Sequence, residues 1–180
     1  VLIFFGSARI KPYQPFYRWV EDMVYLVSND NKDKVDAIVT GAGPGLMEAV
    51  NKGAKKAGIK SYGLSIDLPQ QEFPNPYLDR FIKFRYFFTR KIGFIKRAEG
   101  IIVLPGGFGT LNELLEILVL KQRSYIRGIP ILLVNSKFYN GFLYFLGRVE
   151  KMGFLNVFSA TNTVKSGKSF FALFMISICP

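Results

Sequence analysis

Short apolar runs alternate along the chain with longer runs in which apolar residues recur every three to four positions. The short runs, which we interpret as strands, cover residues 1–5, 35–40, 60–66, 100–104 and 129–134. The longer runs, which we interpret as helices, cover residues 16–27, 45–57, 88–98 and 110–123. Strands that are apolar throughout are typical of a parallel sheet covered on both faces. The pattern predicts an α/β fold, a doubly wound Rossmann-like parallel sheet with helices on both faces.

A glycine-rich turn joins the fourth apolar run to the next helix. It consists of Gly106, Gly107, Phe108, Gly109 and Thr110. Glycines let the backbone turn tightly and approach a ligand, and the helix N-terminus behind them carries about half a positive charge. We therefore expect this loop to bind an anion, most simply a phosphate. One alternative needs no ligand, because Thr110 and Glu113 have the spacing of a capping box.

A second glycine-rich turn follows the second apolar run, with glycines at 41, 43 and 45. A dinucleotide fingerprint would place its third glycine at 46, which is leucine, so the match is incomplete. An NAD site with Asp67 as the ribose-binding acid stays open as an alternative. Two such turns in one short chain favour a nucleotide-sized ligand that lies across the strand ends.

Length and composition indicate one well-packed domain over residues 1–180, since 49% of the residues are hydrophobic. Cys179 is the single cysteine, so no intrachain disulfide is expected and the cytoplasm is the expected compartment. The longest apolar segment, residues 170–179, is too short to span a bilayer. Proline-rich residues 68–79 are expected to form a loop, and no clear pattern follows residue 154.

Histidine is absent, which removes Ser-His-Asp triads and His-ligated metal sites from consideration. The net charge of +11 would suit nucleic acid, but the basic residues are scattered and solvated helix faces explain most of them. We therefore expect neither a nucleic-acid partner nor a metal. Any chemistry must use carboxylates, arginine, lysine or the backbone.

Four motifs together resemble the Lonely Guy family of cytokinin-activating phosphoribohydrolases. They are Gly6 to Arg9, Gly41 to Met47, Phe87 to Lys91 and Pro105 to Glu113, and the resemblance covers residues 1–150. Many members carry an older label, possible lysine decarboxylase. That activity has no support in the residues, because there is no cofactor-binding Ser-x-His-Lys motif and no histidine to stack on pyridoxal phosphate.

The resemblance implies cofactor-free hydrolysis of the N-glycosidic bond of a purine nucleoside 5′-monophosphate, with Arg90 and Glu113 as catalytic residues. The substrate-binding residues that we expect are Gly6, Ser7, Gly43, Met47, Glu72, Lys91, Gly106, Gly107, Phe108, Gly109 and Thr110. AMP or an N6-modified AMP is the expected substrate. Asn112 and Val119 depart from the plant enzymes, which often have glutamate and threonine there, so the fine substrate choice stays open.

Two expectations concern partners and alternatives. The helix over residues 110–123 is apolar around most of its circumference and relatives form dimers, so we expect a homodimer. The main alternative to an enzyme is a non-catalytic module, because similar scaffolds serve as molybdenum-cofactor carriers or DNA-processing proteins. The carboxylate of Glu113 beside a phosphate loop favours the enzyme, since a carrier needs no such group.

Overall fold

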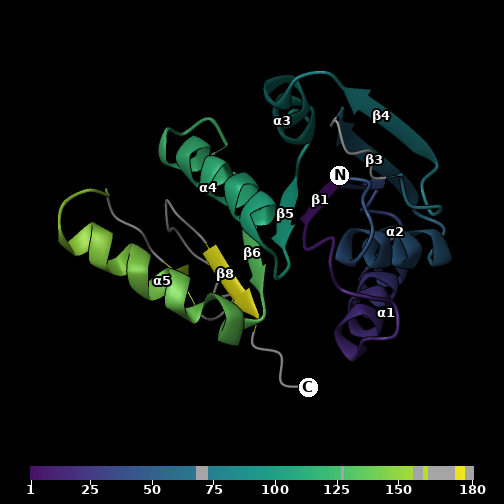
Figure 1. The fold of residues 1–180 in the computed structure, drawn as a ribbon, viewed down its shortest axis with the longest axis horizontal. Coiled ribbons are helices and arrows are strands. Elements are labelled where there is room, and N and C mark those ends of the chain that lie inside the picture. Colours follow the sequence, from purple (N-terminus) through teal and green to yellow (C-terminus); the bar gives the residue numbers. More distant parts are fainter. Residues whose placement is uncertain (68–72, 127, 156–159, 162–172, 177–180) are drawn as a thin grey trace.

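One sheet runs through the computed structural model of the chain, with helices packed on both of its faces (Figure 1). The structure describes residues 1–67, 73–126, 128–155, 160–161 and 173–176. Over this part of the chain the strand order is β4-β3-β2-β1-β5-β6-β8-β7, and every neighbouring pair is parallel. This confirms the predicted doubly wound α/β fold.

The elements alternate along the chain much as the hydropathy pattern predicts. The strands are β1 (Leu2–Phe5), β2 (Ala37–Thr40), β3 (Lys60–Ile66), β4 (Arg80–Phe84), β5 (Gly100–Val103), β6 (Ile131–Val134), β7 (Ala160–Thr161) and β8 (Leu173–Ile176). The helices are α1 (Pro15–Asp30), α2 (Leu46–Lys56), α3 (Phe87–Ile95), α4 (Phe108–Gln122) and α5 (Ser136–Lys151).

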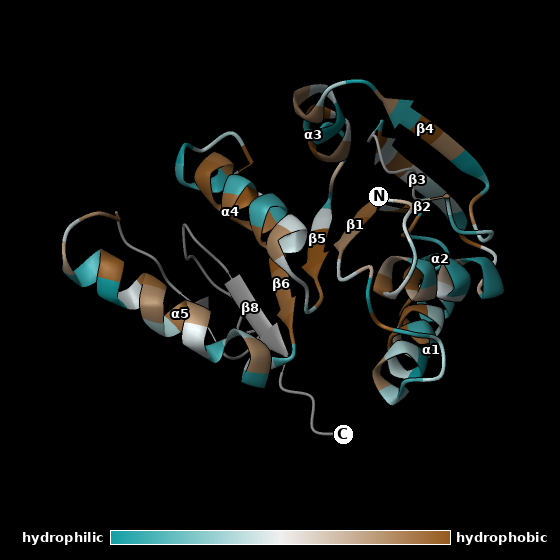
Figure 2. Cartoon of the chain, in the orientation of Figure 1, coloured by the Kyte–Doolittle hydropathy of each residue, from teal (hydrophilic) through white to brown (hydrophobic). Residues whose placement is uncertain are grey.

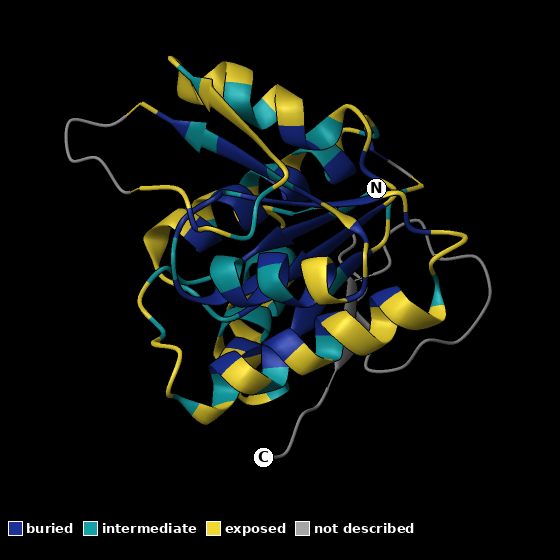
Figure 3. Ribbon diagram, turned by 90° about the vertical axis from the view of Figure 1, so that its right-hand side faces the viewer, coloured by how far each residue is buried: buried dark blue, intermediate teal, exposed yellow. Residues whose placement is uncertain are grey.

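Each face of the sheet has its own apolar core, because successive strand residues point to opposite sides. Phe4 of β1 packs with α1 and α2 on one face, whereas Ile3 and Phe5 pack with α3, α4 and α5 on the other. β2 and β5 are buried along their whole length. The central strands are accordingly apolar in Figure 2 and buried in Figure 3, and the helices expose their outer faces.

The chain changes direction between β1 and β5, which are neighbours in the sheet. From β1 it winds outward through β2 and β3 to β4, and it then returns to β5 and continues through β6 toward the other edge. The loops at the carboxyl ends of β1 and β5 therefore diverge. Such a switch point is where doubly wound sheets bind ligands.

Among the described elements, β4, α5, β7 and β8 were not expected from the sequence. Residues 80–84, directly after the expected proline-rich loop, form the edge strand β4, and residues 136–151 form α5. Leu114, Ile117 and Leu118 of α4 are buried in its own core, so the apolar surplus on that helix is smaller than expected. Within the described ranges, no helix combines the length and hydropathy needed to cross a membrane.

Candidate active site

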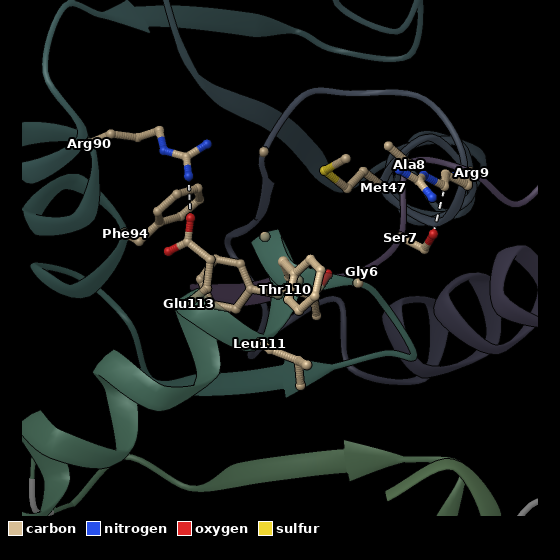
Figure 4. A pocket seen from close by; sticks show the side chains of 15 residues that line it. Gly6, Ser7, Ala8, Arg9, Met47, Arg90, Phe94, Thr110, Leu111 and Glu113 are labelled. Carbon is tan, nitrogen blue, oxygen red and sulfur yellow. Dashed lines mark hydrogen bonds and ion pairs between the residues drawn. The ribbon is translucent and has the colours of Figure 1, made fainter.

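A cavity of about 520 Å³ opens at the switch point, within the size range of small-molecule sites. Its walls come from the loops after β1, β2 and β5 and from α2, α3 and α4 (Figure 4). Most of the predicted site residues line it, namely Gly6, Ser7, Met47, Arg90, Gly107, Phe108, Gly109, Thr110 and Glu113. Segments far apart in the sequence thus meet where both glycine turns were expected to meet.

The phosphate loop runs directly into α4. Gly107 is the N-cap, and the Leu111 N–H donates the first helical bond to its carbonyl oxygen at 3.0 Å. The amides of residues 108–110 precede that bond, so they have no acceptor within the helix. Because Thr110 lies inside the first turn and is not the N-cap, the capping-box interpretation is wrong. A Cβ at position 106 would lie 2.1 Å from Thr110 Oγ1, which explains Gly106.

Arg90 of α3 and Glu113 of α4 form an ion pair on one wall of the cavity (Figure 4). Their side chains are only 15% and 11% exposed. The Arg90 guanidinium also lies 5.5 Å from the ring centroid of Phe94 and 5.8 Å from that of Phe87. Aromatic rings attract the cation and exclude water around it. The guanidinium is therefore held in one place while its Nε, which has no hydrogen-bond partner, stays buried.

Burial raises the pKa of the Glu113 carboxyl above its ordinary value. The positive charges of Arg90 and Lys91 lower that pKa, and the nearby Glu116 carboxylate raises it. Desolvation is the largest of these effects, since an ionised carboxylate is costly in a site with little water. A carboxylate with a raised pKa is better able to accept a proton at neutral pH.

Lys91 does not line the cavity, although the resemblance implies a substrate-binding role. It forms an ion pair with Glu116 and donates a hydrogen bond to Asn112 Oδ1 at 3.1 Å. Asn112, where a glutamate is common in the plant enzymes, thus belongs to a contact between α3 and α4. Arg90 and Lys91 together fasten α3 to the helix that carries Glu113.

The remaining predicted residues lie elsewhere. Gly43 and Gly106 are not among the cavity-lining residues, and Glu72 lies outside the described residues. The carbonyl of Gly43 accepts a hydrogen bond from Asn75 at 3.0 Å. Asp67, the ribose acid of the dinucleotide alternative, forms an ion pair with Lys83 and does not line the cavity.

Sequence reasoning did not assign three notable cavity residues, Phe5, Arg9 and Phe94. Phe94 follows Arg90 by four positions in a helix, and this spacing, which puts both on one face, was the available signal. Arg9 is exposed and lies across the cavity from Arg90 (Figure 4). Its backbone N–H donates to Ser7 Oγ at 3.1 Å, which shapes the loop after β1. The cavity therefore has a cationic side chain on each of two walls.

The chain is similar in sequence to proteins whose names describe the cleavage of nucleotides. It is 28% identical over 158 residues to "Cytokinin riboside 5′-monophosphate phosphoribohydrolase LOG7" of Arabidopsis thaliana, covering 87% of this chain and 70% of that protein. It is 34% identical over 110 residues to "Pyrimidine/purine nucleotide 5′-monophosphate nucleosidase" of Escherichia coli, covering 56% of this chain. The chain spans only 24% of the length of that bacterial relative.

The fold also occurs in proteins with other roles. The solved structure of the molybdenum cofactor carrier protein from Chlamydomonas reinhardtii matches with a TM-score of 0.58 at 17% sequence identity, covering 88% of each chain. A likeness at this identity shows the fold alone. A family model described as "Possible lysine decarboxylase" matches residues 47–170. The chain therefore belongs to this possible lysine decarboxylase family, the Lonely Guy family that its four motifs resemble.

Proposed function

We propose that the protein is a nucleoside 5′-monophosphate phosphoribohydrolase that cleaves AMP or an N6-modified AMP into free base and ribose 5-phosphate. The observation that carries this proposal is the position of Glu113, a buried carboxylate on the wall of the cavity, five residues after the glycine-flanked start of α4. The names of the plant and bacterial relatives support the same reaction class.

The 5′-phosphate binds at the N-terminus of α4. The amides of residues 108–110 have no acceptor in the helix, and Gly107 and Gly109 leave space for a phosphate oxygen to approach them. Glu113 follows Phe108 by five residues, which is about 7–8 Å along the helix axis. A bound ribose can span this interval, so C1′ of the sugar comes to lie beside the Glu113 carboxylate.

Glu113 stabilises the charge that develops as the glycosidic bond breaks. The C1′–N bond breaks with its electron pair leaving on the base, and the ribose becomes an oxocarbenium-like cation. A carboxylate beside C1′ interacts more strongly with this cation than with the neutral ground state, so it lowers the barrier. Water then bonds to C1′ and gives its proton to Glu113, which passes it on to the departing base.

Arg90 orients the Glu113 carboxylate and balances its negative charge. An arginine stays protonated at all relevant pH values, so it does not act as a base. Its guanidinium is held by Phe87 and Phe94 and pairs with Glu113, which keeps that carboxylate on the cavity wall.

The proposal extends to the assembly and location of the protein. Residues 1–180 form one nucleotide-binding domain that works as a homodimer in the cytoplasm, without a cofactor. Exposed apolar side chains on α3 and α4, among them Phe88 and Val119, support a partner surface beside the site.

The decisive experiment incubates the protein with AMP, N6-isopentenyl-AMP and the matching nucleosides and measures released base by chromatography. We expect release from the monophosphates and none from the nucleosides, because the phosphate anchors the substrate to α4. Equal rates of base release from nucleosides and monophosphates would contradict the claim that the phosphate loop binds the 5′-phosphate. Binding of AMP without any released base would favour the alternative, a non-catalytic carrier.

A further inference from the structure

A buried polar cluster lies behind the cavity, at the carboxyl end of β2. It is formed by Thr40, Asn51, Ser61 and Asn75, all of which are at most 6% exposed. Thr40 Oγ1 donates to Asn51 Oδ1 at 2.7 Å, and Asn51 Nδ2 donates to Ser61 Oγ at 2.8 Å. None of these residues lines the cavity. Buried polar groups that hold one another in this way specify a single arrangement of the segments that carry them.

Asn75 connects this cluster to the glycine turn after β2. Its side-chain Nδ2 lies 3.2 Å from the carbonyl oxygen of Ala42, 3.0 Å from that of Gly43 and 3.0 Å from Asn51 Oδ1. Its backbone N–H donates to the Ala42 carbonyl at 2.9 Å, and its Oδ1 accepts the Tyr77 N–H at 3.2 Å. Every polar group of this side chain is therefore in use, and its bonds converge on two consecutive carbonyls.

The glycine turn needs such support. Ala42 has a φ of +70°, a conformation that residues with a side chain seldom adopt. The turn also packs tightly, since a Cβ on Gly63 of β3 would lie 2.5 Å from the Ala42 Cβ. The Ala42 carbonyl keeps the Asn75 backbone N–H as a donor, but the carbonyl of Gly43, which is also buried, accepts from the Asn75 side chain and would be costly to leave without a donor. Asn75 supplies that donor.

The same turn forms a wall of the cavity. Gly41 and Met47 line the cavity, and the Leu46 N–H donates to the Ser7 carbonyl at 2.8 Å. A Cβ at Gly45 would lie 2.5 Å from the same Ser7 oxygen. A change in the turn would therefore move Gly41 and Met47 and, through the Ser7 contact, the loop after β1.

We propose that Asn75 is a positioning residue that fixes this wall and thereby sets the affinity for the nucleotide. The inference rests on the proposed function, because it assumes a nucleotide in the cavity. The phosphate loop has support of its own, from the packing of Thr110 on Gly106 and from a bond of 2.8 Å from the Leu104 N–H to the Phe5 carbonyl, in addition to the bond of 3.1 Å that its Pro105 carbonyl accepts from the Ser7 N–H. Loss of Asn75 thus weakens substrate binding without moving Glu113.

The test compares steady-state kinetics of Asn75→Ala and the wild-type protein on AMP. We expect KM to rise at least about tenfold while kcat stays within about threefold, because misplaced binding groups cost affinity and the reacting groups stay in place. Affinity for ribose 5-phosphate, measured by calorimetry, should stay close to the wild-type value, since this product binds through α4. Asn75→Asp should behave like Asn75→Ala, because it places oxygen atoms against three acceptors.

Val20→Ala is the matched control for lost stability. Val20 of α1 is fully buried on the same face of the sheet, and it does not line the cavity. Val20→Ala should have a lower melting temperature than the wild-type protein and an unchanged KM for AMP. If Asn75→Ala lowers the melting temperature and leaves KM unchanged as well, Asn75 has only a structural role and the inference fails. If Asn75→Ala does not fold, Asn75→Ser, which keeps one donor, takes its place with the same expected rise in KM.

The two proposals fail in different ways. If the wild-type protein binds AMP but releases no base, the proposed function fails. The role of Asn75 is then tested by comparing the Kd for AMP of Asn75→Ala with that of the wild-type protein, both measured by calorimetry. A Kd that rises about tenfold in Asn75→Ala would support the positioning role. An unchanged Kd would overturn it. A wild-type protein that binds neither AMP nor ribose 5-phosphate would overturn both proposals.

Discussion

At the scale of single residues, the chemistry depends on how Glu113 is solvated. Its carboxyl is buried, and the resulting rise in its pKa exceeds the opposing effect of the Arg90 and Lys91 charges. The ionised form is therefore less stable in this site than in water, and more ready to accept a proton or to meet a developing cation. The position of this glutamate could be predicted from its motif, but its burial depends on α3, which the motif does not specify.

Glu113→Gln should lower kcat at least about 10²-fold, the range found when one preorganised electrostatic group is removed. The substitution keeps the shape of the side chain but removes the charge that stabilises the oxocarbenium. We expect the melting temperature at neutral pH not to fall, because the site disfavours the charge that is lost. Glu116→Gln is the control, since Glu116 pairs with Lys91 and does not line the cavity. A sharp drop in melting temperature with turnover preserved would make Glu113 a structural residue.

The raised pKa of Glu113 also predicts how stability depends on pH. The folded protein holds this proton more tightly than the unfolded chain, whose carboxyl titrates near 4.5. The stability contributed by protonated Glu113 is therefore full below pH 4.5 and is lost as the pH rises through the folded-state pKa. Relative to wild type, Glu113→Gln should gain unfolding free energy over that interval, measured by urea denaturation at several pH values. A loss of unfolding free energy relative to wild type would show that the Arg90 charge affects the pKa of Glu113 more than burial does.

Removing Arg90 should raise the pKa of Glu113 further, because its positive charge lowers that pKa in the folded protein. In Arg90→Met, the acidic limb of the kcat/KM profile should therefore move to higher pH. Carbon-13 NMR of labelled glutamate provides the same pKa without turnover. Lys96→Met, which removes a cation of the same helix region away from the cavity lining, serves as the control. An acidic limb that stays in place would mean that the pair contributes no electrostatic coupling.

At the scale of elements, predictability followed burial. β2 and β5 are apolar and buried throughout, and their sequences predicted them. β4 was missed because four of its five residues are exposed, so it lacks the continuous apolar run of an interior strand. α5 contains Gly141 and Gly147 and buries only Tyr139 and Leu146, which weakens both helix propensity and periodicity. Elements such as these bury few residues, and the hydropathy pattern of a sequence detects mainly buried residues.

The turn before α4 offers an element-scale test. Gly106→Ala places a methyl group against the Thr110 side chain, an overpacking that costs about 1–3 kcal/mol. We expect a lower melting temperature and at least about tenfold lower kcat/KM, because the amides at the start of α4 shift.

Gly109→Ala is the matched comparison, since the added methyl group meets no atom within 4 Å apart from its chain neighbours and the backbone of its own helix. It should keep its melting temperature and lose AMP affinity, because Gly109 lines the cavity. Gly141→Ala on α5 also adds a methyl group to open space, and it should lower neither the melting temperature nor the affinity for AMP. If Gly106→Ala is as stable and active as Gly141→Ala, the loop is more adaptable than its packing indicates.

At the scale of the whole molecule, the topology gathers the site. Ser7, Met47, Arg90 and Glu113 come from separate segments and meet because the strand order reverses between β1 and β5. The alternation of elements was sufficient to predict this edge as the binding region. It was not sufficient to predict the contacts behind it, such as Asn75 with Ala42, because hydrogen bonds between residues 33 positions apart leave no periodic signal.

The proposed homodimer is the last prediction. Phe108, Leu115 and Val119 lie on one side of α4 and are 93%, 46% and 53% exposed, which makes an apolar stripe, and Phe88 of α3 is also exposed. Light scattering should therefore give twice the 20.4 kDa of one chain. Leu115→Glu should yield single chains with reduced activity, whereas Leu26→Glu, at an exposed leucine on α1, should leave the dimer intact. A fully active wild-type protein with the mass of one chain would contradict both the interface and its link to catalysis.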